Sequence, residues 1–475
     1  MLYINGEWIT TEDQLDVINP STSEVVDSVS KSSETETSDA IKAAKEGMKS
    51  WSKLTAKERY GYLNRVAEIL RSKTYQIAEV ITKEMGKPLN ESKGEISLAI
   101  DYLEWYAEEG RRVYGETIPT SAENKRLMVT HQPVGVVGAI TPWNFPIAMI
   151  TRKMAPAMAA GCAVVLKPAS ATPLTAVEVI KACHEAGIPK GVVNLLHGSA
   201  SKIVKVLMDS PDVRKITFTG STEVGKQLMR QAADTMKKIS LELGGHAPFI
   251  VFEDADLEQA TDGAIASKFR NAGQTCVCAN RMYVHESIAK DFSELLAKKM
   301  RKLVIGDGNK DNVTIGPLID HGAVEKAASH VEDAKSKGAE VVVGGNRLTE
   351  GEFANGFFFE PTLLMNATED MKISYEETFG PVAPVFPFKT EEEAIEKANS
   401  SEYGLASYIY TKDGSRMFRV SEALEYGIVG VNDPLPTVAQ APFGGVKESG
   451  LGREGGRQGI EDFLEEKFVS FQLDD

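Results

Sequence analysis

The loop at residues 269–281 holds the residues whose types and spacing most clearly permit chemistry. It places the thiol of Cys276 among small and polar residues, with Arg270 and Arg281 nearby in the chain. A thiol that only fills a core has Leu, Ile and Val as neighbours, and this one does not. Backbone N–H groups and cations favour the thiolate, which is the nucleophilic form of cysteine. The sequence therefore predicts a cysteine nucleophile that ionises easily.

Four other groups stand where binding or catalysis is possible, and each also has a purely structural interpretation. The glycine turn at residues 218–225 could hold a phosphate on backbone N–H groups or bind nothing. Lys167 could hold a ribose hydroxyl or a phosphate, or simply be solvated. Glu242, within an apolar run, could be a general base with a raised pKa, or a cap or ion-pair partner. Asn144, in a loop bounded by prolines, could cap a helix or direct its amide at an oxyanion.

Composition restricts the classes of protein that could carry these groups. The 475 residues predict two or three structural units, and the net charge of -15 without a basic block argues against nucleic-acid binding. The sequence contains no run of about 18 apolar residues, so no membrane span is predicted. No secretion signal is seen, and the four cysteines show no zinc-type or disulfide spacing, so we expect a reduced, cytoplasmic enzyme without a metal.

The elements that must position these groups follow from hydrophobic periodicity. Residues 36–110 read as helical, in segments at 40–49, 56–73 and 95–112. Strands and helices then alternate, with apolar strands at 134–141, 163–167, 192–196, 215–219 and 239–242, and helices at 146–160, 175–186, 201–210 and from 222. This alternation predicts a parallel sheet covered on both faces, with ligands at the carboxyl ends of its strands.

A second alternating series runs from about residue 281 to 431. Its clearest strands are predicted at 281–285, 339–343, 358–364 and 406–410. A glycine-rich loop follows at 442–459, and residues 467–473 alternate like an edge strand. This last segment and the polar stretch 117–131 are candidates for pairing with another subunit.

Taken together, the motifs resemble those of the NAD(P)-dependent aldehyde dehydrogenase superfamily, and the resemblance covers essentially the whole chain. They stand in order as Pro142-Trp-Asn-Phe-Pro, Lys167-Pro-Ala-Ser, Gly220-Ser-Thr-Glu-Val-Gly, Leu241-Glu-Leu-Gly-Gly, Gly273-Gln-Thr-Cys, Glu377-Thr-Phe-Gly-Pro and Pro442-Phe-Gly-Gly-Val-Lys-Glu-Ser-Gly. The resemblance implies an α/β fold with three parts: a Rossmann-type cofactor domain (1–116 and 132–243), an α/β catalytic domain (244–448) and a small β oligomerisation element (117–131 and 449–475). It also implies a homodimer or homotetramer.

The resemblance assigns roles to individual residues. Cys276 would be the nucleophile that forms a thiohemiacetal and then a thioester, Glu242 the base that activates water, and Asn144 an oxyanion donor. Glu454 would help proton movement. The residues implied in cofactor binding are Thr141, Pro142, Trp143, Lys167, Ser170, Gly220, Ser221, Gly225, Leu243, Glu377 and Phe379.

The residues that would choose the aldehyde look most like those of the succinate-semialdehyde dehydrogenase branch. By that resemblance Arg152 and Arg270 clamp a remote carboxylate, with Thr437 and Phe443 also lining the substrate site. Structural ion pairs are the alternative role for both arginines. Residues 432–440 lack the serine-containing run usual in that branch. Another semialdehyde such as glutarate semialdehyde, or a broad range of aldehydes, therefore stays open.

Two more expectations concern the cofactor and the second thiol. Ser170 stands where family members hold a glutamate that repels a 2′-phosphate, so NADP is expected to be preferred and NAD to be usable. Cys278 is either a small buried side chain or, as the resemblance suggests, the partner of Cys276 in a reversible disulfide. A thiol hydrolase or acyltransferase with a histidine base is the competing enzyme class, and it would need no nicotinamide cofactor.

Overall fold

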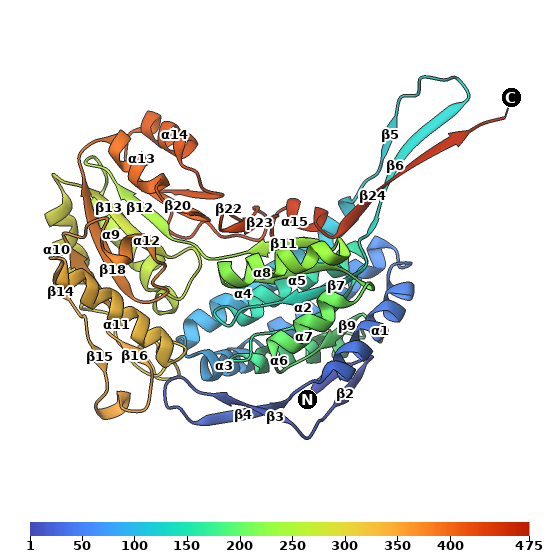
Figure 1. The fold of residues 1–475 in the computed structure, drawn as a ribbon, viewed down its shortest axis with the longest axis horizontal. Coiled ribbons are helices and arrows are strands. Elements are labelled where there is room, and N and C mark those ends of the chain that lie inside the picture. The colour runs from blue at the N-terminus through green and yellow to red at the C-terminus, as the bar shows by residue number, and fades with distance from the viewer. Residues whose placement is uncertain (475) are drawn as a thin grey trace.

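A computed structural model gives the fold of residues 1–474, and it contains two large sheets with helices packed around them (Figure 1). The first sheet has the strand order β2-β1-β9-β8-β7-β10-β11-β23. Its five central strands are mutually parallel: β7 (Val136–Ile140), β8 (Ala163–Lys167), β9 (Val193–Leu195), β10 (Val213–Thr219) and β11 (Lys238–Glu242). The predicted parallel sheet is confirmed.

The helices of this region follow the predicted alternation, with one additional helix. They are α1 (Glu34–Trp51), α2 (Ala56–Ser72), α3 (Thr74–Met85), α4 (Leu89–Glu109), α5 (Pro146–Ala160), α6 (Pro173–Glu185), α7 (Ala200–Asp209) and α8 (Thr222–Ala232). α3 lies within the range 36–110 that was expected to be helical, but it was not predicted as a separate segment. The periodicity did not predict the N-terminal strands β1 (Leu2–Ile4), β2 (Glu7–Ile9), β3 (Gln14–Ile18) and β4 (Val25–Ser30). β1 extends the first sheet antiparallel to β9, and β3 pairs with β4.

The register of the first sheet gathers its polar strand ends. Ile140 pairs with Lys167 across β7 and β8, and Thr219 pairs with Glu242 across β10 and β11. β7 and β8 are buried along their whole length. Since the chain reaches the same edge each time it leaves a parallel strand, residues far apart in sequence meet there.

The second sheet has the order β14-β17-β18-β13-β12-β20-β21. Its strands are β12 (Ala247–Val251), β13 (Ala279–His285), β14 (Glu340–Val343), β17 (Thr362–Met365), β18 (Val382–Phe388), β20 (Ala406–Tyr410) and β21 (Ile428–Val431). All its pairings are parallel except that of β14 with β17.

One predicted strand of this region is wrong in its extent. Residues 358–364 form two strands, β16 (Phe358–Phe359) and β17, and β16 pairs instead with β15 (Arg347–Leu348). Pro361 separates them, and a proline has no N–H with which to continue a ladder.

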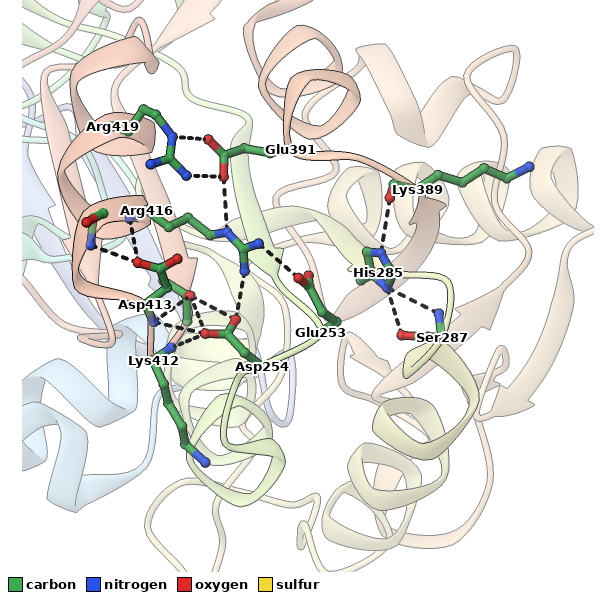
Figure 2. A network of polar contacts seen from close by, with 12 residues as sticks. Glu253, Asp254, His285, Ser287, Lys389, Glu391, Lys412, Asp413, Arg416 and Arg419 are labelled. Atoms are coloured by element: carbon green, nitrogen blue, oxygen red, sulfur yellow. Dashed lines mark hydrogen bonds and ion pairs between the residues drawn. The ribbon is translucent and has the colours of Figure 1, made fainter.

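Helices cover the second sheet and an ion-pair network fixes two of them. The helices are α9 (Leu257–Phe269), α10 (Ala289–Met300), α11 (His321–Ser336), α12 (Lys372–Tyr375), α13 (Glu391–Asn399) and α14 (Gly414–Ala423). Figure 2 shows Arg416 of α14 between Glu253, Asp254 and Glu391, at 2.9, 2.9 and 3.0 Å. Arg419 holds the same Glu391 at 2.6 Å.

A three-stranded arm projects from the body (Figure 1). It consists of β5 (Glu116–Ile118), β6 (Lys125–Pro133) and β24 (Leu464–Gln472), with β24 antiparallel to β6 along the whole of both strands. The residues just before β24 lie elsewhere: β22 (Val446–Lys447) pairs with β19 (Tyr403–Gly404), and β23 (Gly450–Leu451) joins the first sheet beside β11. Of the segment predicted at 449–475, β23 thus belongs to the first sheet and β24 to the arm.

The remaining elements are short. They are α15 (Gln458–Glu461) and the 3-10 turns η1 (Gly110–Arg112), η2 (Ala233–Thr235), η3 (Arg270–Gly273) and η4 (Gly351–Phe353). None of the helices within residues 1–474 is long and apolar enough to cross a membrane.

Candidate active site

Cys276 lies in the loop between η3 and β13, and the backbone of that loop is unusual. Asn271, Ala272 and Gly273 have successive φ values of 52°, 54° and 76°. Only glycine adopts such angles freely, and a side chain at Gly273 would also collide with the carbonyl of Gly380. Neighbouring elements hold the turn in place: Asn271 N–H donates to Glu91 at 2.8 Å, and its side-chain amide donates to the Asn144 carbonyl at 3.0 Å.

Two cavities meet at Cys276. One, of about 310 Å³, is lined by residues that include Glu91, Tyr102, Phe145, Met149, Arg152, Arg270, Thr275, Cys276, Val277, Leu435, Thr437 and Phe443. The other, of about 250 Å³, is lined by Pro142, Trp143, Asn144, Met149, Thr219, Gly220, Ser221, Leu243, Gly244, Cys276, Lys326, Glu377 and Phe379. A sulfur atom shared by two cavities can contact a different molecule from each side.

The thiol does not ionise easily in this environment, contrary to the expectation from its sequence neighbours. Burial raises the pKa of Cys276 to about 12, with Arg152 and Arg270 opposing the rise and Glu242 adding to it. Arg281 is not among the main groups acting on this pKa, and its guanidinium donates to the carbonyls of His246 and Ala398 at 3.0 Å each. The neighbouring cations were identified correctly for Arg270 only.

Asn144 faces Cys276 from the loop before α5. Its side-chain amide donates to the Gln274 carbonyl at 3.1 Å, and its Oδ1 is buried without a hydrogen-bond partner among the described residues. Its carbonyl accepts from Lys87 at 2.7 Å, and the Lys87 ammonium is held in turn by Glu95 at 2.6 Å. Glu95 also accepts from Ile147 N–H at 2.9 Å. This buried network fixes the position of the Asn144 amide.

Glu242 lies at the end of β11, buried and facing the glycine-rich loop. A side chain at Gly444 would approach Glu242 Oε1 to 2.8 Å, and Glu242 Oε2 has no hydrogen-bond partner within residues 1–474. Burial raises the pKa of Glu242 well above its ordinary value, and the nearby Glu454 carboxylate raises it further. A carboxyl with a raised pKa and a free oxygen is suited to accept a proton.

Glu454 is buried between two cations. Arg152 Nε approaches its Oε2 to 2.5 Å, and Lys153 Nζ contacts its Oε1. Burial acts to raise the pKa of Glu454, but Lys153 and Arg152 outweigh that effect and hold it below the ordinary value. Glu454 lines neither cavity, so any effect on the chemistry passes through Arg152, Lys153 or Glu242.

All four residues expected to contact substrate line the larger cavity: Arg152, Arg270, Thr437 and Phe443. The Arg152 guanidinium carbon lies 4.2 Å from the centre of the Phe443 ring, and that of Arg270 lies 5.2 Å from the Phe145 ring. Arg152 forms the structural ion pair that was its alternative role, since its guanidinium pairs with Glu454. Arg270 has no ion-pair partner in the part of the chain that the structure describes.

Sequence reasoning did not identify several residues of this wall, including Glu91, Tyr102, Met149 and Leu435. Glu91 and Tyr102 belong to α4, whose periodic pattern indicated only a packed helix. No motif surrounds them, so sequence spacing carried no signal for their role. Tyr102 lies beside Arg152: burial raises the pKa of the Tyr102 hydroxyl, and the charge of Arg152 opposes that rise.

The smaller cavity holds most of the residues expected to bind a cofactor. Trp143 and Phe379 meet edge to face with ring centres 5.6 Å apart. Glu377 accepts from Gly245 N–H at 3.2 Å, and burial raises the pKa of Glu377 to about 7. Thr219 Oγ1 is buried here without a hydrogen-bond partner within residues 1–474. Gly220 and Gly244 add no side chain to the cavity, so a flat polar group fits against its backbone.

The other expected cofactor residues lie along the same sheet edge but outside this cavity. Lys167 ends β8, is buried, and burial lowers its pKa to about 8. Ser170 is exposed and donates to the Gly198 carbonyl at 3.4 Å. Gly225 lies in the first turns of α8, where a side chain would collide with Leu243. Thr141 follows β7, and its Oγ1 has no hydrogen-bond partner in residues 1–474.

No histidine lines either cavity among the described residues. His246 follows Glu242 in sequence, but it is buried and bonded to the Ser374 carbonyl at 2.9 Å. Burial and Arg281 lower the pKa of His246 well below its ordinary value. The competing thiol hydrolase with a histidine base therefore lacks its base beside Cys276.

Comparison with known proteins agrees with this geometry. The sequence model of the aldehyde dehydrogenase family matches residues 8–469. The NADP(+) succinate-semialdehyde dehydrogenase GabD of Escherichia coli is 53% identical over 472 residues, which are 99% of this chain and 97% of that protein. The glutarate-semialdehyde dehydrogenase of Pseudomonas putida is 53% identical over 473 residues, again 99% and 97%. A crystal structure of an NADP-dependent enzyme of Escherichia coli superposes with a TM-score of 0.98 at 53% identity, covering 100% of this chain and 98% of that one.

Proposed function

Since the chain belongs to the aldehyde dehydrogenase family, we propose that it oxidises succinic semialdehyde to succinate with a nicotinamide cofactor. One observation carries the proposal: Cys276 is shared by a cavity lined with two arginines and a cavity lined with the glycine turn and Glu377. A substrate with an aldehyde at one end and a carboxylate at the other fits the first cavity with its two ends at Cys276 and the arginines.

The chain's own residues support each step of the proposed reaction. Cys276 Sγ attacks the aldehyde carbon, and the Asn144 amide and the Cys276 N–H hold the oxyanion of the resulting thiohemiacetal. When bound, the nicotinamide supplies the acceptor for the hydride. Glu242 then takes a proton from water as the water attacks the thioester, and the carboxylate product leaves.

Because burial holds the pKa of Cys276 at about 12, the thiol needs a base or an added positive charge to react. Glu242 has a free oxygen and a raised pKa, so it can take the Cys276 proton as well as the proton of water. We propose that Glu242 is the base in both halves of the reaction, first for the Cys276 thiol and then for water.

The two arginines provide the preference for a charged substrate. Arg152 and Lys153 share the single carboxylate of Glu454, and Arg270 faces the cavity without a paired carboxylate. Arg152 and Arg270 thus present two guanidinium groups to the larger cavity, and a substrate carboxylate can bind them through charge-assisted hydrogen bonds. Glutarate semialdehyde, one methylene longer, is the second candidate, and the relative from Pseudomonas putida favours it.

For the cofactor we propose a preference for NADP over NAD. The neutral Ser170 beside the buried Lys167 places no carboxylate against a 2′-phosphate, and the Escherichia coli relative is an NADP(+) enzyme. Burial lowers the pKa of Lys167 to about 8, so the free protein loses this cation above that pH.

We also propose that the arm of β5, β6 and β24 joins copies of the chain into a homodimer or homotetramer. The arm stands away from the body, and Phe468 and Phe471 of β24 are 60% and 46% exposed. An exposed strand edge with aromatic side chains is stabilised when another chain covers it.

The proposal is tested by one matrix of rates. Succinic semialdehyde, glutaric semialdehyde and uncharged butanal are each assayed with NADP and NAD, using the wild type and Arg270→Met. We expect succinic semialdehyde with NADP to have the highest kcat/KM, and Arg270→Met to lower it about 30-fold while leaving butanal within a few fold. Butanal turned over as well as either semialdehyde would contradict the proposed substrate. A higher kcat/KM with NAD would contradict the proposed cofactor preference alone.

A further inference from the structure

Cys278 lies two residues after the nucleophile, but its side chain faces Lys268 of α9. Cys278 Sγ is 3.4 Å from Lys268 Nζ and 3.6 Å from the Lys268 carbonyl oxygen. Both residues are 0% exposed, and neither lines a cavity described above. A buried thiol and a buried amine are therefore in direct contact behind the catalytic loop.

Lys268 differs from the other buried lysines near the site. Lys87 and Lys153 are ion-paired with Glu95 and Glu454. Lys268 has no ion-pair partner within residues 1–474, and its one other polar contact is the Asn280 side-chain oxygen at 2.8 Å. An unpaired buried ammonium is costly, so this environment favours the neutral amine, which is the nucleophilic form.

The charges of the pair are consistent with that contact. Burial lowers the pKa of Lys268, with a smaller opposing effect from Cys278. Burial likewise raises the pKa of Cys278, with Lys268 opposing it. Burial thus favours the uncharged form of each group, so that a neutral nitrogen lone pair lies beside the sulfur.

We propose that Lys268 and Cys278 form a reversible sulfur–nitrogen bridge when the protein meets hydrogen peroxide. Peroxide first oxidises the Cys278 thiol to a sulfenic acid, and its O–O bond breaks to release one water. The Lys268 nitrogen then attacks the sulfenic sulfur. The S–N bond forms as the S–O bond breaks, and the leaving hydroxide takes an amine proton to become a second water. The thiol and the amine together lose two hydrogen atoms, and the peroxide is reduced to two waters.

The position of the bridge relates it to the catalytic loop. Lys268 lies in the last turn of α9, and Cys278 immediately precedes β13. A bond between them ties the two ends of the segment that carries Cys276 and the left-handed turn at residues 271–273. The bridge also protects Cys278 from further, irreversible oxidation, because its sulfur no longer carries a free sulfenic acid.

Trypsin distinguishes this bridge from a disulfide between Cys276 and Cys278. Cleavage after Lys268, Arg270 and Arg281 places both thiols in the peptide 271–281 and Lys268 at the end of the peptide 239–268. A disulfide removes two hydrogens within peptide 271–281. The sulfur–nitrogen bridge removes two hydrogens but blocks cleavage at Lys268, and it joins peptide 239–270 to peptide 271–281.

The experiment is peptide mass mapping of the purified full chain after mild hydrogen peroxide, alkylation of free thiols and digestion without reductant. We expect the joined 239–270 and 271–281 species, and its loss after treatment with a reductant. Cys276→Ser, which cannot form the disulfide, keeps the joined species. Lys268→Arg keeps a long basic side chain and the trypsin site, but its guanidinium stays protonated and offers no neutral amine, so this variant abolishes the species.

Two controls make the outcome decisive. Cys162 is also buried, but its sulfur bonds to the Phe463 carbonyl at 3.5 Å and has no lysine hydrogen-bond partner within residues 1–474, so no bridged peptide should contain it. Lys268→Met is similar in volume to lysine and serves if Lys268→Arg does not fold. Loss of two hydrogens confined to peptide 271–281, a joined species that survives in the Lys268 variants, or no joined species in the wild type would each overturn the proposal.

Discussion

Two clusters of arginine and carboxylate side chains in this molecule differ in their burial and in their balance of charges. The Arg152 cluster consists of Arg152, Lys153 and Glu454 and lies fully buried beside Cys276. The Arg416 cluster consists of Arg416, Arg419, Glu253, Asp254 and Glu391, and it is partly exposed, with Arg416 itself 16% exposed (Figure 2).

Their charge balance is opposite. The Arg152 cluster has two cations for one carboxylate, while the Arg416 cluster has two cations for three carboxylates. Asp254 of the second cluster also accepts from the N–H groups of Lys412 and Asp413 at 2.8 and 2.9 Å. The Arg416 cluster is therefore satisfied within the fold and joins α13 and α14 to the second sheet. The Arg152 cluster has fewer carboxylates than cations, and its arginine lines a cavity.

The largest expected difference between the clusters is in stability. Glu454→Gln leaves two buried cations without a carboxylate and should lower the free energy of unfolding by about 3–5 kcal/mol. Glu391→Gln should cost about 1 kcal/mol, because solvent screens the Arg416 cluster. Urea unfolding followed by tryptophan fluorescence measures both variants. Equal losses would show that burial does not separate the two clusters.

The next difference is in catalysis. Arg152→Gln should lower kcat/KM for succinic semialdehyde about 100-fold, equivalent to about 2.7 kcal/mol, since it removes a buried partner for the substrate carboxylate. Uncharged butanal serves as the internal reference and should lose much less. Arg416→Gln is the matched control and should leave both substrates unchanged. A parallel loss on both aldehydes would restrict Arg152 to a structural role.

A third difference is in pH dependence. Burial and Glu454 raise the pKa of Glu242, and only the ionised carboxylate accepts a proton, so kcat should fall as the pH falls through that raised value. Glu454→Gln removes the negative charge near Glu242, so the acid limb of the kcat profile should move to lower pH. Glu391→Gln should leave the limb where it is. A limb that stays fixed in Glu454→Gln would show that Glu242 and Glu454 do not interact.

The smallest expected effect is that of salt. Raising the ionic strength from about 0.1 to about 1 M shortens the Debye length from about 10 to about 3 Å, which weakens exposed pairs more than buried ones. The destabilisation caused by Glu391→Gln should therefore shrink by a few tenths of a kcal/mol, while that caused by Glu454→Gln stays constant. Urea unfolding at the two salt concentrations checks this.

Local sequence patterns predicted the first sheet and the main helices well, because hydrophobic periodicity is set by neighbouring residues. The predicted helix at 146–160 and the strand at 163–167 match α5 and β8 residue for residue. The N-terminal strands β1 to β4 were not predicted, since short strands with mixed exposure carry little periodic signal. The predicted strand at 358–364 was divided by Pro361, which local apolar composition did not reveal.

The sequence by itself determined the family, the order of the five parallel strands of the first sheet and the groups present at the site. Motifs of residues that are adjacent in the chain indicate those properties. The tertiary structure decided the environments: the raised pKa of Cys276, the hydrogen bond of Arg281 to the Ala398 carbonyl, and the sharing of Glu454 by Arg152 and Lys153. It also placed Cys278 against Lys268. Burial and contact between distant segments set pKa values and partners, and neither can be read from the spacing of residues along a chain.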